Sequence, residues 1–198
     1  MQCGNNFKQF GIALHSYHAA QGNFPSAFLA SPNGWHPSWS WSTFLLPHLE
    51  QPPLSDNLEV DTQEFGSGHM FPPAWQDTQY PLSIYRCPSD GGAPLNHRKG
   101  DHGRSNYRAV VGNITELQVT YQTLMEENGI VVANGQTRVG DIRDGSSQTI
   151  AIGECVLDPG TNGNVGAIWA GMRGSDNGTD YYVSDTAWFL NSDPDWSI

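Results

Sequence analysis

Two stretches near the carboxyl end of the chain combine short acidic and amide side chains with glycine, a composition that suits a hard cation. The side chains that could supply ligands are Asp158, Asn162, Asp176, Asp180 and Asp185. Calcium gathers about six to eight oxygen ligands, and oxygens a few residues apart on a glycine-rich backbone can supply them. No EF-hand pattern occurs, and Asp, Asn and Gly also build ordinary turns. These residues could form a calcium site or only turns, and we predict Ca²⁺ as the ligand.

Two histidines, His15 and His18, lie three residues apart in the first helical segment and could meet a transition metal on one face. No H-E-x-x-H pattern accompanies them, and spacing alone identifies no third ligand. We expect both to be buried and hydrogen-bonded in a structural role rather than to bind a metal ion.

The chain shows none of the short motifs that mark nucleophilic or phosphate chemistry. It lacks G-x-S-x-G, S-x-x-K and a glycine-rich phosphate loop. The Gly174-Ser175-Asp176 segment lacks the strand–turn–helix context that would expose a serine. Twenty acidic residues are too many to single out one catalytic pair. Catalytic sites are built by geometry, so an enzyme is not excluded, but we expect a non-enzymatic protein and assign no catalytic residues.

The overall charge limits which partners the chain can have. The net charge is −11, from 9 Lys and Arg against 20 Asp and Glu. This surface would repel a polyanion, which disfavours nucleic-acid binding and adhesion to anionic lipid. No run of about 18 apolar residues occurs, so no membrane-spanning helix is predicted. We expect no nucleic-acid partner and no membrane contact by this chain.

Three cysteines are present, Cys3, Cys87 and Cys155, and no two have C-x-x-C spacing. A structural zinc site is therefore not predicted. One disulfide with a leftover thiol is typical of an exported protein, and three buried thiols are typical of a cytosolic one. Composition leaves both open.

The clearest element is a helix over about residues 5–20. Asn5 or Asn6 can cap its start, and Gly22 is a natural end. An apolar stripe recurs at helical spacing at Phe7, Phe10, Leu14 and Tyr17. Such a helix is marginal alone, so we expect it to pack on a sheet.

The remaining segments predict short elements and long loops, consistent with 22 glycines and 13 prolines. Residues 39–50 could form a short strand or helix, 51–81 one short helix, and 93–104 an exposed loop. Short strands are expected at 81–87, 106–111, 130–133, 149–154, 165–170, 181–183 and 187–190. A leading helix followed by antiparallel strands predicts an α+β fold in one domain over 1–198. Its parts are the helix, a loop-rich insert at about 26–104 and a sheet region at about 105–190.

Four motifs follow one another along residues 3–154. They are Cys3 with Asn5-Asn6-Phe7-Lys8-Gln9 through Phe24-Pro25, Trp41 with Leu45-Leu46-Pro47 and Leu49-Glu50-Gln51, Cys87-Pro88-Ser89-Asp90 with Tyr107 and Gly112, and Asp141-Ile142-Arg143-Asp144-Gly145 through Gly153-Glu154. In this order they resemble DUF1559, a bacterial family of prepilin-type proteins similar to the pseudopilin G of type II secretion.

The resemblance implies a pilin-like fold, with an N-terminal helix packed on an antiparallel sheet carrying long loops. Family members typically begin with a prepilin cleavage site and an apolar half-helix, and end with a His-to-Asp-Gly motif. We expect these before Met1 and after Ile198, so the chain would be a soluble head domain. The resemblance also implies a disulfide between Cys3 and Cys87, with Cys155 as a buried free thiol, and strengthens the expectation of calcium in a late loop.

These expectations combine into one leading hypothesis, a periplasmic or cell-surface structural protein that binds other pilin-like subunits or secretion components. The alternative is a calcium-dependent hydrolase of esters or lactones, in which the ion polarises a carbonyl group. A second alternative is a carbohydrate-binding module that uses exposed Trp35, Trp39 or Trp41, although most such rings are expected in the core.

Overall fold

The computed structural model describes residues 2–29, 38–60, 75–112, 128–156 and 166–172, and the backbone of 187–189. The calcium candidates Asp158, Asn162, Asp176, Asp180 and Asp185, and the strand expected at 181–183, lie outside these residues. No helix in the described residues is long and apolar enough to cross a membrane.

Helix α1 spans Gln2–Gln21 and is longer at its start than predicted. Its buried residues, Asn6, Phe10, Ala13 and Leu14, recur at helical spacing on one face. Asn6 therefore lies inside the helix and does not cap it, which corrects the expected start. Gly22 ends the helix as predicted, with φ +82° and its N–H donating to the carbonyl of His18 at 2.8 Å. Glycine accepts this left-handed backbone without steric cost.

The other helical elements are short and connect the strands. They are α2 (Trp41–Phe44), η1 (Leu46–His48), α3 (Pro52–Leu58), α4 (Trp75–Thr78), η2 (Ser83–Tyr85), η3 (His97–Lys99) and η4 (Val139–Asp141). The described parts of the 51–81 segment, 51–60 and 75–81, therefore hold two short α-helices, not one. The expected strand at 81–87 is wrong, because that segment forms η2 between Pro81 and Pro88, where proline cannot donate to a ladder.

The strands form three small sheets. Their bounds are β1 (Ser38–Trp39), β2 (Leu95–Asn96), β3 (His102–Ser105), β4 (Tyr107–Gly112), β5 (Ile152–Glu154), β6 (Ala167–Ile168), β7 (Gly171–Met172) and β8 (Ala187–Phe189). The sheet orders are β1-β7, β2-β3-β6 and β5-β4-β8. Every described strand pair is antiparallel except β4 with β8, which is parallel. The α+β class is confirmed, and the purely antiparallel sheet is corrected by this one pair.

Several strand expectations need correction. Only Ile152–Glu154 of the 149–154 segment is a strand, and 130–133 forms no strand although it is largely buried. The backbone of 130–137 bonds instead to 24–28, for example from the N–H of Ala27 to the carbonyl of Val132 at 2.9 Å. The 93–104 segment was expected to be an exposed loop, but it forms β2, η3 and most of β3. Four of its polar residues are buried, Asn96, Lys99, His102 and Arg104, whereas His97 and Asp101 are exposed or half exposed.

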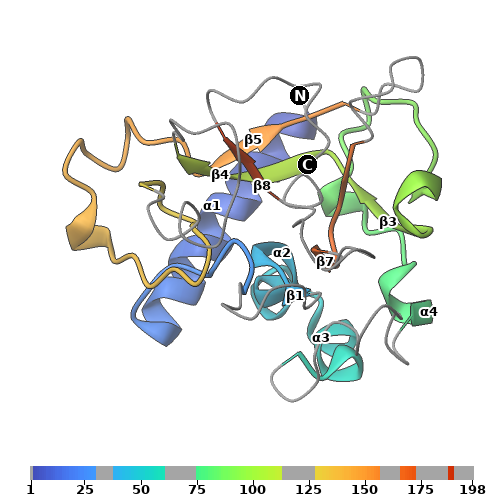
Figure 1. The fold of residues 1–198 in the computed structure, drawn as a ribbon, viewed down its shortest axis with the longest axis horizontal. Helices are drawn as coiled ribbons and strands as arrows, with labels where there is room; N and C mark the ends of the chain where they lie inside the picture. The colour runs from blue at the N-terminus through green and yellow to red at the C-terminus, as the bar shows by residue number, and fades with distance from the viewer. Residues whose placement is uncertain are drawn as a thin grey trace, which may run out of the picture.

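Aromatic rings join α1 to the sheet. The ring of Phe10 lies 4.9 Å from Tyr107 on β4, 5.6 Å from Trp41 on α2 and 5.4 Å from Tyr85 on η2, measured between centroids. Phe7 makes a second edge-on contact with Tyr107 at 5.1 Å. In Figure 1, α1 accordingly passes behind β4 and β5. The predicted packing of the first helix on a later sheet is therefore observed, and its contacts come from large rings.

Candidate functional site

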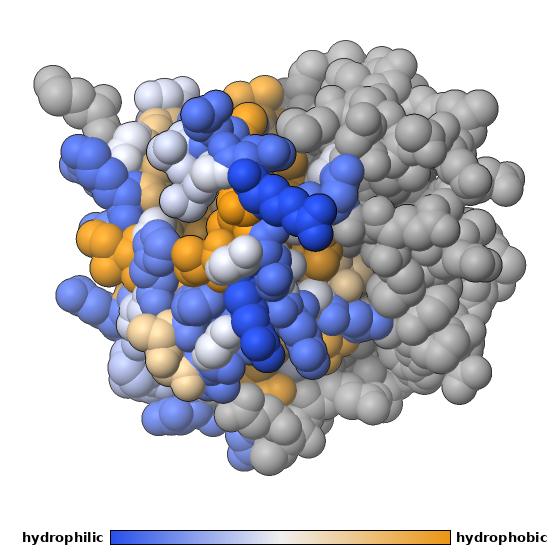
Figure 2. Space-filling model, turned by 90° about the vertical axis from the view of Figure 1, so that its left-hand side faces the viewer, coloured by the Kyte–Doolittle hydropathy of each residue, from blue (hydrophilic) through white to orange (hydrophobic). Residues whose placement is uncertain are grey.

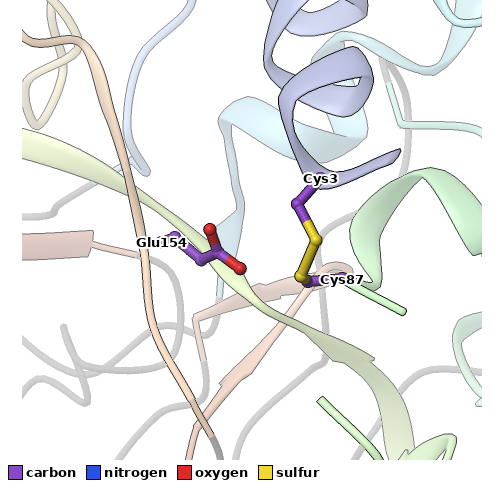
Figure 3. Close-up of side chains that lie close together, drawn as sticks. All are labelled: Cys3, Cys87 and Glu154. Carbon is purple, nitrogen blue, oxygen red and sulfur yellow. A yellow bond between two sulfur atoms is a disulfide. The ribbon is translucent and has the colours of Figure 1, made fainter. Parts of the chain in front are cut away.

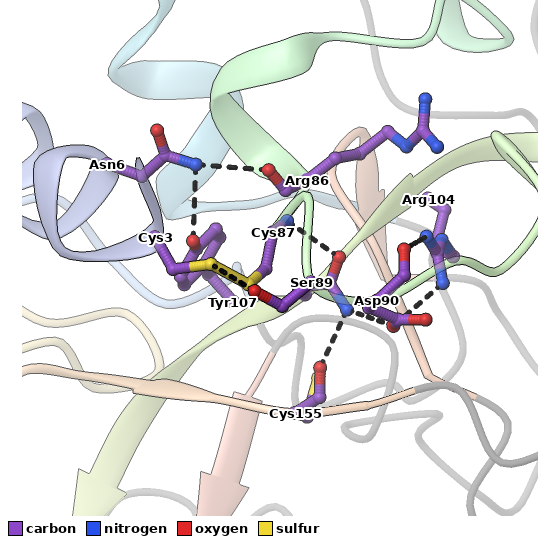
Figure 4. The surroundings of a disulfide bond; sticks show 10 residues. Cys3, Asn6, Arg86, Cys87, Ser89, Asp90, Arg104, Tyr107 and Cys155 are labelled. Atoms are coloured by element: carbon purple, nitrogen blue, oxygen red, sulfur yellow. Dashed lines mark hydrogen bonds and ion pairs between the residues drawn. A yellow bond between two sulfur atoms is a disulfide. The ribbon is translucent and has the colours of Figure 1, made fainter. Parts of the chain in front are cut away.

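A disulfide joins the start of α1 to the turn that follows η2. Cys3 and Cys87 are bonded across 84 residues of sequence, with their Cα atoms 5.0 Å apart. Cys155 is a buried free thiol. Both findings confirm the pairing that the family resemblance implied. Figure 4 shows the polar residues that surround this bond, and we call Cys3, Asn6, Cys87, Asp90 and Asn106 the disulfide junction.

Asn6 connects α1 to the segments packed against it through two side-chain hydrogen bonds. Its side-chain amide donates to the carbonyl of Arg86 at 3.1 Å and to the phenolic oxygen of Tyr107 at 3.2 Å. A buried amide that satisfies its donors in this way is stabilising, whereas an unpaired one would cost about 1–3 kcal/mol. These bonds favour the orientation of α1 in which Asn6 faces Tyr107 on β4.

The carboxylate of Asp90 organises the turn after Cys87. It accepts from Nη1 of Arg104 at 2.8 Å, from the backbone N–H of Gly92 at 3.0 Å, and from the side-chain amide of Asn106. Arg104 is fully buried, and its second terminal nitrogen donates to the carbonyls of Asp90 and Gly92. A buried guanidinium needs such an anion, because an uncompensated charge in the interior is strongly destabilising.

Asn106, between β3 and β4, connects the two cysteine-bearing segments. Its side-chain oxygen accepts from the N–H of Cys87 at 2.9 Å, and its amide donates to the carbonyl of Cys155 at 2.9 Å. Its own N–H donates to the carbonyl of Tyr85 at 2.8 Å, and its carbonyl accepts from the N–H of Cys155 at 2.7 Å. One residue therefore connects η2, the Cys87 turn and the end of β5, through both its backbone and its side chain.

Two tyrosines near the junction have perturbed acidity. Burial raises the pKa of Tyr107, the hydrogen bond from Asn6 lowers it, and the nearby Glu154 and Cys155 raise it further. Burial alone raises the pKa of Tyr85 well above its ordinary value. The Tyr85 hydroxyl donates to the carbonyl of Ser42 at 2.7 Å. Both phenols are therefore held as neutral hydrogen-bonding groups.

Asn6, Asp90, Arg104 and Asn106 form a connected set that the sequence does not predict. Cys87-Pro88-Ser89-Asp90 was noted as a motif, but its partners on β3 lay in a segment interpreted as an exposed loop. Arg104 is the residue from which this set could have been predicted. It lies in a segment that forms a buried strand, and a buried arginine requires an acidic partner.

The two helix histidines do not converge on a common ligand point. His18 is half-buried, packs on Phe24 with ring centroids 5.0 Å apart, and accepts from the N–H of Val139 at 3.3 Å. His15 is exposed and lies 6.2 Å from the same ring, which corrects its expected burial. Trp39 and Trp41 are buried in the core, and Trp35 lies outside the described residues. Neither described tryptophan is available to stack on a carbohydrate.

A serine–histidine pair occurs on the opposite face of α1. The hydroxyl of Ser16 lies 2.9 Å from Nδ1 of His48 on η1. Beside it is a pocket of about 200 Å³ lined by Gln9, Ile12, His48, Leu49 and Glu50. Within the described ranges, no carboxylate bonds the second ring nitrogen of His48, so this pair lacks the orienting group of a full catalytic triad.

Comparison with known proteins identifies a family. A family model described as "Protein of unknown function (DUF1559)" matches residues 1–197. No curated protein and no solved structure matches the chain.

Proposed function

The chain belongs to the DUF1559 family, and from this premise and the packing of α1 we propose that it is a pilin-like head domain. It would serve as a structural or interaction protein of a secretion or surface apparatus, outside the cytoplasm. Its partners would be other pilin-like subunits or secretion components, and calcium bound in the late acidic loops would stabilise it.

The observation that carries the proposal is the way α1 is held. The Phe10 ring of the helix packs against Tyr107, Trp41 and Tyr85, and a disulfide secures its first turn. A helix held at its middle and at its start is a rigid support. This is the property that a subunit needs if an assembly is to be built along its first helix.

The outer face of α1 is free to serve as a contact surface. Ile12 is 69% exposed, and it borders the pocket that His48 and Leu49 also line. Exposed large hydrophobic side chains elsewhere are scattered, and Figure 2 shows hydrophobic residues interspersed among hydrophilic ones on the face that it draws. An apolar side chain beside a pocket on a rigid helix is a natural anchor for a partner.

In vivo photo-crosslinking tests this proposal. A photoreactive amino acid at position 12 is expected to capture pilin-like subunits or secretion components, identified by mass spectrometry. The matched control is the same residue at position 150, where Ile150 is 57% exposed on a different segment. Capture of the same proteins from both positions, or of none from position 12, would count against α1 as the docking face.

Ester hydrolysis is a second candidate function, favoured by the Ser16–His48 pair beside a pocket. A hydroxyl within hydrogen-bonding reach of an imidazole is the minimum arrangement for a base-activated nucleophile. Turnover of chromogenic esters and lactones by the wild type, and its loss in Ser16→Ala, would support this function. Turnover that persists in Ser16→Ala but stops with a chelator would support the calcium-dependent hydrolase instead.

A further inference from the structure

Three side chains with metal-binding chemistry meet at the disulfide junction. The sulfur atoms of Cys3 and Cys87 and a carboxylate oxygen of Glu154 all lie within 4.8 Å of one another. Figure 3 shows the Glu154 carboxylate extending from β5 beside the sulfur–sulfur bond. The three residues come from the start of α1, the turn after η2 and the end of β5.

The oxidation state of the sulfurs decides what this cluster can bind. In the disulfide each sulfur is neutral and bonded to the other, whereas the cysteine ligand of a metal ion is the thiolate. The oxidised cluster therefore offers only one good ligand, the Glu154 carboxylate. Reduction would add two anionic sulfur ligands to it.

We propose that the reduced form of this protein binds one thiophilic divalent cation, Zn²⁺, through Cys3, Cys87 and Glu154. Tetrahedral zinc has Zn–S distances of about 2.3 Å and Zn–O distances of about 2.0–2.2 Å, which place neighbouring ligand atoms about 3.5–3.8 Å apart. In the oxidised protein the two sulfur atoms are bonded to each other, and a carboxylate oxygen of Glu154 lies within 4.8 Å of both. Once the bond is reduced, the sulfur atoms must move apart to reach these positions, by rotation of the two cysteine side chains. A water molecule would take the fourth position.

The chemistry balances with a dithiol reductant. The dithiol gives two electrons and two protons to the Cys3–Cys87 bond and becomes a disulfide itself, leaving two thiols on the protein. Zinc then displaces the two thiol protons as two Zn–S bonds form, and the Glu154 carboxylate completes the protein ligands. The bound ion would tie α1 to the Cys87 turn in place of the covalent bond.

Exposure of the residues fits this sequence of events. Cys3 is half-buried in the first turn of the helix, and Glu154 is exposed, whereas Cys87 is only 3% exposed. The proposal therefore assigns the sulfur of Cys3, the less buried of the two cysteines, as the atom that a dithiol attacks, with the Cys87 sulfur as the leaving group. The acidic net charge of the chain also favours the approach of a cation.

The test titrates the full chain with metal ions after reduction by a dithiol and its removal without oxygen. Zn²⁺ binding is followed by calorimetry, and Co²⁺ is used as a spectroscopic probe for thiolate charge-transfer bands. We expect one ion per reduced chain, and binding at least about a hundredfold weaker to the oxidised chain. Glu154→Gln is expected to weaken binding by about tenfold or more, and the control Cys155→Ser is expected to leave it unchanged.

Three results would overturn the proposal. They are equal binding by the oxidised chain, binding that Glu154→Gln leaves intact, and binding that Cys155→Ser abolishes. If reduction unfolds the chain, Zn²⁺ is expected to restore its helical circular dichroism, and failure to do so would also overturn it. The proposal does not depend on the pilin-like function, so either can fail without the other.

Discussion

The Asp90 carboxylate joins the turn after Cys87 to the stretch that contains β3. It accepts from Gly92 in its own turn, and from Arg104 and Asn106 on that stretch. The charge of Arg104 is fully buried, so the Asp90 carboxylate compensates a cation that has no access to water. Breaking such a pair by removing one partner costs far more than breaking a surface pair.

Replacing this carboxylate tests that difference directly. Asp90→Ala is expected to lower the free energy of unfolding by about 3 kcal/mol, because the Arg104 guanidinium would remain buried without its anion. The control is Asp101→Asn, since Asp101 is half exposed, pairs with the exposed His97 and has a φ of 61° that Asn also tolerates, so it should cost less than about 1 kcal/mol. Urea denaturation of both variants measures the two costs, and equal losses would contradict the role given to Asp90.

The buried phenol of Tyr85 predicts a loss of stability at high pH. The pKa of Tyr85 is raised by burial above 10.0, the value expected in the unfolded chain. Above pH 10 the unfolded state therefore releases a proton that the folded state retains, so the free energy of unfolding falls as pH rises. Each such group contributes a slope of about 1.4 kcal/mol per pH unit.

Tyr85→Phe separates the two contributions of this side chain. At neutral pH the variant should lose about 1 kcal/mol, because the carbonyl of Ser42 loses its donor. Above pH 10 its stability should fall less steeply than that of the wild type. Parallel alkaline slopes in denaturation experiments would show that another group is responsible.

Among the secondary-structure elements, a side-chain hydrogen bond fixes β6 and β7 beside the segment that precedes η2. The indole N–H of Trp169, between β6 and β7, donates to the carbonyl of Tyr80 at 2.9 Å. This bond passes directly over Gly103 on β3, where a Cβ atom would come within 2.6 Å of the Tyr80 carbonyl oxygen and would also meet the indole. Position 103 therefore requires glycine, because Trp169 and the Tyr80 carbonyl approach it too closely for a side chain.

Gly103→Ala is expected to destabilise the protein by about 1–3 kcal/mol, because the added methyl group must displace the indole or the backbone. Gly91→Ala is the matched control, since a Cβ there would meet nothing within 4 Å. Thermal denaturation compares the two variants. A loss no larger in Gly103→Ala than in Gly91→Ala would show that the β2-β3-β6 sheet can shift to make room.

For the whole molecule, the disulfide is the covalent tie between the first helix and the rest of the fold. It joins residues 84 positions apart, so it restricts the unfolded chain over much of its length. The segments that it joins are also held by Asn6 and Asn106. We therefore expect reduction to weaken the folded state without changing its arrangement.

Reduction in the presence of a chelator is expected to lower the free energy of unfolding by about 4 kcal/mol on the chain-entropy model. The double variant Cys3→Ala with Cys87→Ala should give a similar loss. Cys155→Ser leaves the disulfide intact and should not show this loss. Denaturant unfolding with and without reductant is the measurement. An unchanged midpoint would mean that the polar contacts alone hold α1 in place.

Calcium binding is a second prediction at this scale. If the late acidic loops bind Ca²⁺ in the folded state, a hundredfold excess over the dissociation constant should add about 2.7 kcal/mol to stability. The melting temperature should therefore rise with Ca²⁺ and fall with a chelator, with Mg²⁺ as the control. Substituting Asp176 and Asp180 together by Asn should remove the effect, and a melting temperature indifferent to Ca²⁺ would refute the site.

Features that depend on local chemistry and on ordered motifs can be predicted from the amino-acid sequence. The α+β class, the helix ending at Gly22 and the strand near 106–111 follow from periodicity and glycine conformation, which act over a few residues. The family and the Cys3–Cys87 bond followed from the order of four motifs. These patterns can be read without knowing which segments pack against one another.

The burial of polar residues and the pairing of short segments depend on long-range contacts and become visible only in the folded structure. The 130–133 segment was expected to be a strand, but its backbone bonds to 24–28 instead, a choice made by contacts over a hundred residues away. The 93–104 segment was expected to be exposed, yet Arg104 is fully buried, because its partner Asp90 becomes a neighbour only once β3 has folded beside the Cys87 turn. Burial of a charge depends on a partner brought by the fold, and a linear sequence does not show that partner.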